Sequence, residues 1–177
     1  RSRLTGEFMD LTGLVRENGM LHWDVPQGVW RIVVITAMTN ACAACNDYVN
    51  FLSGASVRFL IDTVYEPHFA HFGESFGRTL SGFFSDEPGF YTGTSEMYPL
   101  EERIGQRDLP LPWAEDLRIL LDQRYPWLRE CLPLLWYDGK GSAEARSAYM
   151  EAVTFLYQKN YVQQVGDWCE AHGVQYI

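Results

Sequence analysis

The sequence predicts an α/β fold in which an N-terminal β-hairpin region precedes alternating strands and helices. Three observations predict it: two apolar runs around a Pro-Gln-Gly turn, a short apolar run that ends at Asp86-Glu87-Pro88, and a long amphipathic helix followed by another short apolar run. The expected order is hairpin, helix, strand, loop, helices and strand. We therefore expect a hairpin and loop segment over residues 1–47 and a β/α portion over residues 48–177.

The hairpin is the first expected element. Residues 20–25 alternate between apolar and polar, Pro26-Gln27-Gly28 supplies a turn, and residues 29–35 return as a β-branched run. The alternation predicts Trp23 in the core and His22 on the surface. Residues 36–47 have no clear period and read as a loop.

A helix is expected next, with Ser53 as its N-cap. Pro67 should interrupt or kink this helix, because proline lacks the backbone N–H and clashes with the preceding turn. Polar aromatic residues on its surface, Tyr65 and His68, are candidate ligand contacts, although such residues usually only pack against a neighbour. The apolar residues that should share one helical face are Val57, Leu60, Ile61 and Val64.

Residues 79–93 contain the features that best predict a functional site. Residues 80–84 are apolar enough for one buried strand, and Pro88 and Gly89 stop that strand. Asp86 and Glu87 are thus presented at its C-terminal end, where open α/β sheets and β/α barrels build active sites. The alternative is a plain polar turn, with Asp86 as a cap and Glu87 in solvent.

The second half is expected to be mainly helical. Residues 91–112 form a long irregular segment of the kind that serves as a lid or binding loop. A helix should begin at Pro112-Trp113 and end at Tyr125. A longer helix is predicted from about 143 to 172, with Gly173 just beyond its end. Its apolar face comprises Tyr149, Val153, Leu156, Tyr157, Tyr161, Val165, Trp168 and Cys169.

Composition limits the function. The 177 residues carry a net charge of −9, which argues against a nucleic-acid partner because phosphate binding needs clustered Lys and Arg. The aromatic share is 15%, and aromatic rings suit carbohydrate contacts. No apolar run reaches the length of a membrane span, and the first residues lack a signal-peptide core, so a cytoplasmic location is favoured. The missing initial Met predicts that the chain is part of a longer protein.

Cysteine spacing offers a weaker alternative. Cys42 and Cys45 form a C-x-x-C pair, and His68 and His71 are three residues apart. A zinc site or a redox pair is conceivable from this spacing, but thiols without special chemistry are favoured. We therefore expect no metal and no cofactor.

Several short motifs, taken in order, resemble bacterial glycoside hydrolases related to α-L-rhamnosidases and β-galactosidase-type enzymes. The resemblance begins near residue 10 and covers most of the chain. Its motifs are WDVPQGVW at 23–30, YVNFL at 48–52, FGESFG at 72–77, FFSDEP at 83–88, LPW at 111–113, LPLL at 132–135 and WCEAHG at 168–173.

The resemblance implies a (β/α)8 TIM-barrel-like catalytic domain, of which this chain would be a partial barrel. Glu87 would be the catalytic general acid and Asp86 its neighbour, because glycoside hydrolysis needs two carboxyl groups, one of them protonated near neutral pH. The chain departs from the family pattern at Asn50, where an acidic residue is usual. The second carboxylate would come from a later strand, so the chain alone should be inactive.

Three functions follow from these readings. The first is a glycosidase fragment that acts on a carbohydrate, with a sugar subsite lined by Phe90, Tyr91 and Trp113. The second is a non-catalytic carbohydrate-binding or interaction module, and the third is a zinc or redox protein built on Cys42 and Cys45. A partial barrel also leaves a strand edge unpaired, and that edge predicts self-association.

Overall fold

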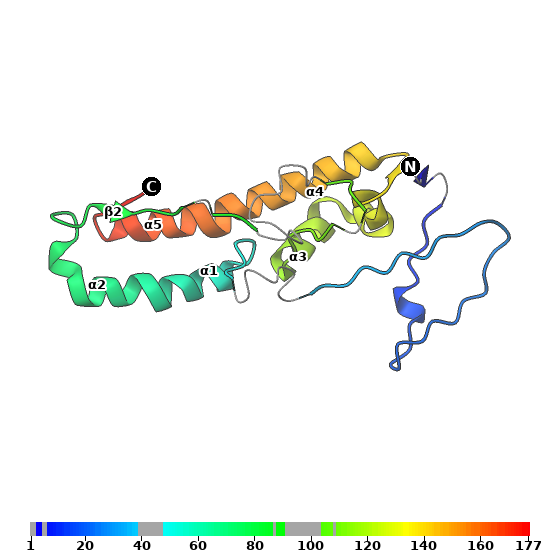
Figure 1. The fold of residues 1–177 in the computed structure, drawn as a ribbon, viewed down its shortest axis with the longest axis horizontal. Helices are drawn as coiled ribbons and strands as arrows, with labels where there is room; N and C mark the ends of the chain where they lie inside the picture. Colours follow the sequence, from blue (N-terminus) through cyan, green and yellow to red (C-terminus); the bar gives the residue numbers. More distant parts are fainter. Residues whose placement is uncertain (1–2, 5–6, 39–47, 87, 91–103, 108) are drawn as a thin grey trace.

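The computed structural model describes residues 3–4, 7–38, 48–86, 88–90, 104–107 and 109–177. One long helical rod runs along the molecule, and two shorter helical units pack against it (Figure 1). The α1–α2 unit lies along the half of the rod that contains α5, and α3 lies along the half that contains α4. The body is therefore two layers of helices.

The long rod consists of α4 (Ser142–Leu156), η5 (Tyr157–Gln163) and α5 (Gln164–Ala171), of which η5 is π-helical. It confirms the predicted helix, and seven of the eight predicted face residues are buried, Tyr157 being only partly so. Gly173 has a φ of 70°, a left-handed conformation that suits glycine at a helix end. The N–H of Val174 donates to Cys169 O at 3.0 Å and closes that end.

The first helical unit is continuous from α1 (Gly54–Leu60) through the π-helical η2 (Ile61–Tyr65) to α2 (Glu66–Phe72). Ser53 is the N-cap, as predicted, and its side chain accepts a hydrogen bond from Ser56 N. Pro67 lies in the first turn of α2 without ending the helix. The π turn directly before it widens the backbone where a proline would otherwise clash.

This π turn also changes which residues are buried. Val57 and Ile61 are fully buried, as expected, but Val64 is 39% exposed and Tyr65 is only 7% exposed. A wider turn delays the return to the same face, so the next buried position moves from Val64 to Tyr65. The expectation at Val64 was wrong for this reason.

The second packing unit is α3 (Glu115–Arg124) followed by the 3-10 segment η4 (Pro126–Leu135). Leu117, Leu120 and Leu121 of α3 are buried against α4, and Tyr125 ends the helix, as predicted. The buried residues form two clusters. One lies between α3, η4 and α4, and the other lies between α1, η2, η5 and α5.

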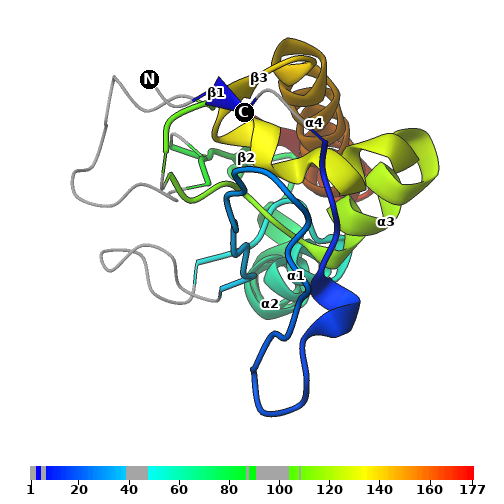
Figure 2. The same ribbon diagram turned by 90° about the vertical axis from the view of Figure 1, so that its right-hand side faces the viewer.

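The described strands are short and form two parallel pairs. β1 (Arg3–Leu4) pairs with β3 (Asp138–Gly139), and Figure 2 shows both near the start of α4. β2 (Gly82–Phe83) pairs with β4 (Gln175–Tyr176), with Gly82 opposite Gln175. Two short 3-10 turns, η1 (Thr12–Leu14) and η3 (Gly73–Ser75), complete the elements.

The predicted α/β fold class, a partial (β/α)8 barrel with an N-terminal hairpin, is wrong. Each described strand has two residues, each described sheet has two strands, and helices make up the body. Of the apolar runs that predicted strands, residues 80–84 contain only the two-residue β2, and residues 29–35 are largely exposed. Strand-like composition over five residues does not produce a sheet when helices already cover the core.

The hairpin was also wrong, because residues 20–35 contain no strand pair. The chain does reverse at the predicted turn, where the rings of Trp23 and Trp30 meet edge to face at 5.6 Å. However, the Val29 side chain is fully exposed and Val34 is 80% exposed. A two-stranded hairpin is marginal without an apolar layer to cover it. His22 is exposed, as predicted, and Trp23 is only partly buried.

Candidate functional site

The acidic pair follows β2, which ends beside β4. Ile177 N donates to Phe83 O at 2.9 Å, and Ser85 N donates to Ile177 O at 3.0 Å. The parallel hydrogen bonding with β4 therefore continues to Ser85, two residues beyond the end of β2. Ser85 is therefore fixed in position by its backbone. Asp86 is the first residue past this pairing, and Glu87 lies outside the described residues.

The two sides of β2 face different surroundings. The ring of Phe83 packs on Tyr65 at 4.6 Å and on Trp168 at 6.0 Å, which places it against the helices. Phe84 is 73% exposed and Asp86 is also exposed, as alternation along a strand requires. The carboxylate faces solvent and makes no ion pair within the described part of the chain.

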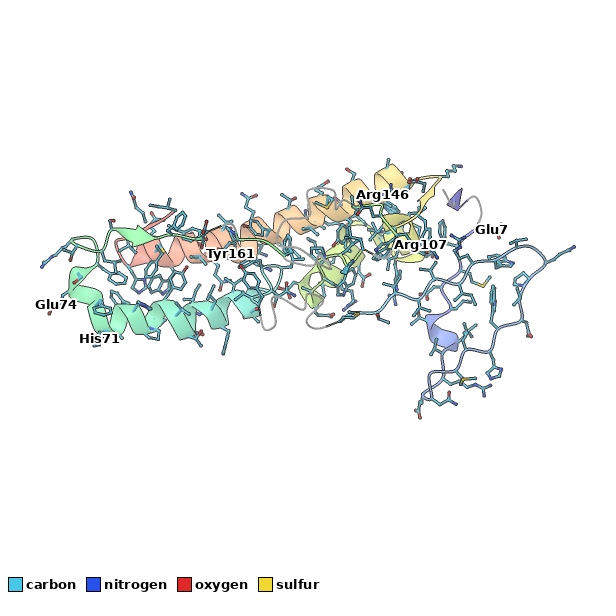
Figure 3. All side chains as sticks on the ribbon, viewed as in Figure 1. Glu7, His71, Glu74, Arg107, Arg146 and Tyr161 are labelled. Carbon is cyan, nitrogen blue, oxygen red and sulfur yellow. The ribbon has the colours of Figure 1, made fainter. Side chains whose placement is uncertain are left out.

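Three hydroxyl groups meet directly before the acidic pair. Ser85 Oγ lies 2.9 Å from Tyr161 Oη and 2.8 Å from Tyr176 Oη, and the two tyrosine oxygens are 2.5 Å apart. Each hydroxyl can donate to one neighbour and accept from the other, which satisfies all three. This hydroxyl triangle joins β2, β4 and η5, and Figure 3 labels Tyr161 midway along the rod.

Burial also shows in the ionisation of the aromatic hydroxyls around the triangle. Desolvation raises the pKa of Tyr176 well above its usual value, the hydrogen bond with Ser85 lowers it by less, and the hydrogen bond with Tyr161 raises it. Desolvation, together with nearby Tyr161 and Cys169, raises the pKa of Tyr65 to about 12. Burial disfavours the charged phenolate, so these hydroxyls stay protonated at neutral pH and can donate hydrogen bonds.

A second tyrosine of η5 reaches the other side of the acidic pair. Tyr157 Oη lies 3.4 Å from the carbonyl oxygen of Pro88, a long and weak hydrogen bond. The ring of Phe90 packs on the Tyr157 ring at 5.7 Å. Phe90, a predicted sugar contact, is therefore engaged with the core.

The segment η5 is itself fixed by buried polar contacts. Asn160 is 8% exposed, and its Nδ2 donates to Leu52 O at 2.7 Å and to Asp116 Oδ2 at 3.1 Å. The same carboxylate oxygen accepts from Gly54 N at 2.9 Å. Asn160 thus links η5 to the start of α1 and to the first turn of α3.

The remaining predicted contacts lie in several places. Tyr65 is buried in the helix layer beneath β2. His68 is exposed, its Nδ1 lies 2.6 Å from Val64 O, and its ring meets Phe83 edge to face. Trp113 is partly buried at the edge of the α3–α4 core, and Tyr91 lies outside the described residues.

Asn50 has a structural role. Its Nδ2 donates to Trp113 O at 2.8 Å, and its Oδ1 accepts from Leu52 N at 3.1 Å. The amide thus joins the segment before α1 to the segment before α3. A carboxylate could make the second contact but not the first, because it has no N–H to donate.

Sequence reasoning missed the four residues around the turn: Ser85, Tyr157, Tyr161 and Tyr176. Tyr157 and Tyr161 were recognised as members of an apolar helix face, with no part in the site. No sequence signal pointed to their place beside the turn, because Tyr161 is 76 residues from Ser85. Ser85 and Tyr176 gave no local signal, because their contacts depend on the pairing of β2 with β4.

The hypothesis of a metal or redox site falls partly outside the described residues, since Cys42 and Cys45 are not among them. In the described part, no group of three His, Cys, Asp or Glu side chains is placed to hold a metal ion. Cys131 and Cys169 are free thiols. Among the described helices, none has the length and apolar character needed to cross a membrane.

Comparison with known proteins gave no match to a family model, a curated protein or a solved structure.

Proposed function

We propose that this chain carries the acid–base turn of a glycoside hydrolase, with Glu87 as the general acid and Asp86 beside it. The observation that carries the proposal is the anchoring of Ser85, the residue directly before Asp86. Ser85 is held by backbone pairing with Ile177 and by the hydroxyl triangle. A catalytic carboxyl group needs this kind of fixed support, because misplacement by about 1 Å can cost roughly a hundredfold in rate.

The open side of β2 suits a carbohydrate. Phe84, which is 73% exposed, precedes Asp86 on that side. An exposed aromatic face next to a carboxylate offers an apolar platform for one side of a sugar ring and a proton donor or acceptor for its oxygens. This arrangement supports a carbohydrate substrate more than a charged one.

The test is hydrolysis of a panel of nitrophenyl glycosides, by this chain and by the longest natural protein that contains it. The Glu87→Gln variant should lose about a hundredfold or more in rate while still binding the substrate. Glu144→Gln, an exposed carboxylate in the first turn of α4, is the matched control and should keep the rate. An unchanged rate for Glu87→Gln would contradict the proposed role.

The second carboxylate of the reaction has to stand about 5–5.5 Å away for retention or about 6.5–9.5 Å for inversion. We propose that it is supplied from outside this chain, so that the chain alone is inactive. Activity in the longer protein and none in the chain is the expected result. Full activity in the chain alone would contradict the second part of the proposal.

A non-catalytic carbohydrate-binding module is the second candidate, and the exposed Phe84 ring favours it. Binding needs an aromatic platform but no pair of carboxyl groups. In that case Phe84→Ala should abolish sugar binding, whereas Glu87→Gln should change neither binding nor any reaction. Isothermal titration with the sugars released from the active glycosides, or with a mixed panel if none is active, separates the two candidates.

A further inference from the structure

An open groove of about 480 Å³ lies between the end of α3 and the rod formed by α4 and η5. Arg124, the last residue of α3, lines one side of it, and residues of the rod line the other. We propose that this Arg124 groove binds a small ligand that carries an oxyanion, a carboxylate or a phosphate, on a hydroxylated body. The inference goes beyond the proposed function, because it uses none of the residues around the acidic turn.

The Arg124 guanidinium is held on an aromatic ring. Its Cζ lies 4.1 Å from the centre of the Phe155 ring, which is the arrangement of a cation–π contact. A guanidinium in this position keeps its N–H donors at its edge, where they can form two parallel hydrogen bonds with a carboxylate or a phosphate. The Arg124 side chain is exposed and makes no hydrogen bond or ion pair with any described residue. Its donors are therefore oriented and open to a ligand.

A second positive charge lies at the same ring. Lys159 Nζ is 5.9 Å from the centre of the Phe155 ring, and within the described ranges Lys159 has no ion pair either. Two cations that share one aromatic ring repel each other. An oxyanion bound beside them would remove this repulsion and gain from both charges.

The acidic residues nearest in the sequence are occupied elsewhere. Asp122 pairs with Arg118 at 2.6 Å, although it lies only two residues before Arg124. Glu151 lines the groove, but it hydrogen-bonds the Tyr125 side chain and so raises the pKa of that hydroxyl. The groove with Lys159 thus carries two positive charges and one negative charge, in a chain whose net charge is −9. This local excess of positive charge favours an anion.

The rest of the groove suits a hydroxylated body. Ser147, Thr154 and Gln158 line it from the rod, at spacings of seven and four residues that place them on one helical face. Hydroxyl and amide groups both donate and accept hydrogen bonds, as the hydroxyl groups of a sugar-like ligand require. Met150, which is 44% exposed, adds an apolar surface for the carbon skeleton. The volume lies within the range of about 300–1,000 Å³ that is usual for small-ligand sites.

NMR titration of the whole chain tests the site, with the backbone amides of residues 147–159 as reporters. The probes are glucuronate, glucose 6-phosphate, glucose and inorganic phosphate, all at one ionic strength. At least one of the two anionic sugars should shift the reporters saturably, and glucose should bind at least about tenfold more weakly, since it lacks the charge. The tighter of the two anionic sugars identifies the preferred oxyanion. No saturable shift with either would overturn the inference, and so would inorganic phosphate binding as tightly as both.

Substitution of Arg124 locates the binding. Arg124→Gln should weaken binding of the tighter probe by about 5- to 10-fold, as expected for losing a charged donor at an exposed site. Arg124→Lys keeps the charge but loses the planar donor pair, so it should recover only part of the affinity. Arg78→Gln removes an exposed positive charge between η3 and β2, outside the groove, and is the matched control. If Arg124→Gln binds the probe as tightly as Arg78→Gln does, the inference is overturned. Circular dichroism checks that each variant keeps its helices.

Discussion

Removing the Asn160 side chain should destabilise the protein more than most single substitutions. Asn160→Ala deletes the donor of two hydrogen bonds, to Leu52 O at 2.7 Å and to Asp116 Oδ2 at 3.1 Å. Leu52 is fully buried, so water cannot easily replace the lost donor at its carbonyl. An unsatisfied buried group costs about 1–3 kcal/mol, and a hydrogen bond to a charged acceptor contributes about 1.5–3 kcal/mol.

These two effects add to an expected loss of about 2.5–6 kcal/mol in the free energy of unfolding. The lower end applies because Asp116 keeps its hydrogen bond from Gly54 N. Urea unfolding followed by circular dichroism measures the loss, provided that the slope with denaturant stays constant. Gln158→Ala, an exposed neighbour in η5, should change stability by less than about 0.5 kcal/mol.

A loss below about 1 kcal/mol in Asn160→Ala would refute the reasoning, since it would mean that the buried amide contributes no more than an average hydrogen bond. Hydrogen exchange at the Ser85 amide extends the test to the site. Because Asn160 holds η5 and directly precedes Tyr161, this variant should also speed exchange at the Ser85 amide.

Three further predictions concern stability and association. Because burial raises the folded pKa of Tyr65 to about 12, its contribution to the free energy of unfolding is fully present below pH 10 and is lost between pH 10 and 12, by about 1.4 kcal/mol per pKa unit. Urea unfolding across this pH range should show that the stability of Tyr65→Phe declines less steeply than that of the unchanged protein. An equal decline in both would contradict this prediction. Ser53→Ala should cost about 0.5–2 kcal/mol of unfolding free energy through loss of the N-cap, whereas Ser53→Thr should cost less. The outer edge of β4 is open in the described fold, and the exposed apolar run 29–35 lies at the opposite end of the molecule, so we expect the run of one copy to pair with β4 of another. The mass measured by light scattering should then rise with protein concentration, and Gly166→Leu should reduce this rise by filling the groove beside β4. A monomer at high concentration would contradict this expectation.

The helices were predictable because their signals are local. Ser53, the leucines of α3 and Gly173 each act within one or two turns, and each was found where the sequence placed it. The error at Val64 came from assuming a uniform 3.6-residue period. Pro67 indicated that the helical turn before it would be irregular. The sequence of that turn does not show whether the irregularity is a kink or a π turn.

The sheet was not predictable in the same way. Residues 29–35 have strong β-propensity, yet propensity becomes a strand only when a partner and a covering layer exist. Arg31 of this run lies over the Tyr137 ring at 5.2 Å, but Val29 and Val34 are exposed in the described fold. At β2, by contrast, Phe83 has a helix layer to pack against, and Tyr176 supplies the partner strand.

The candidate site shows the same division between local and distant information. The acidic pair is visible in the sequence because proline and glycine end the strand beside it. Its supports are not, since Ser85 is 76 residues from Tyr161 and 91 residues from Tyr176. A carboxylate can thus be identified from its neighbours in the chain, whereas the restraint that would make it a precise acid depends on the fold. It follows that Tyr161→Phe and Ser85→Ala test the support of the strand end independently of any change at the carboxylates.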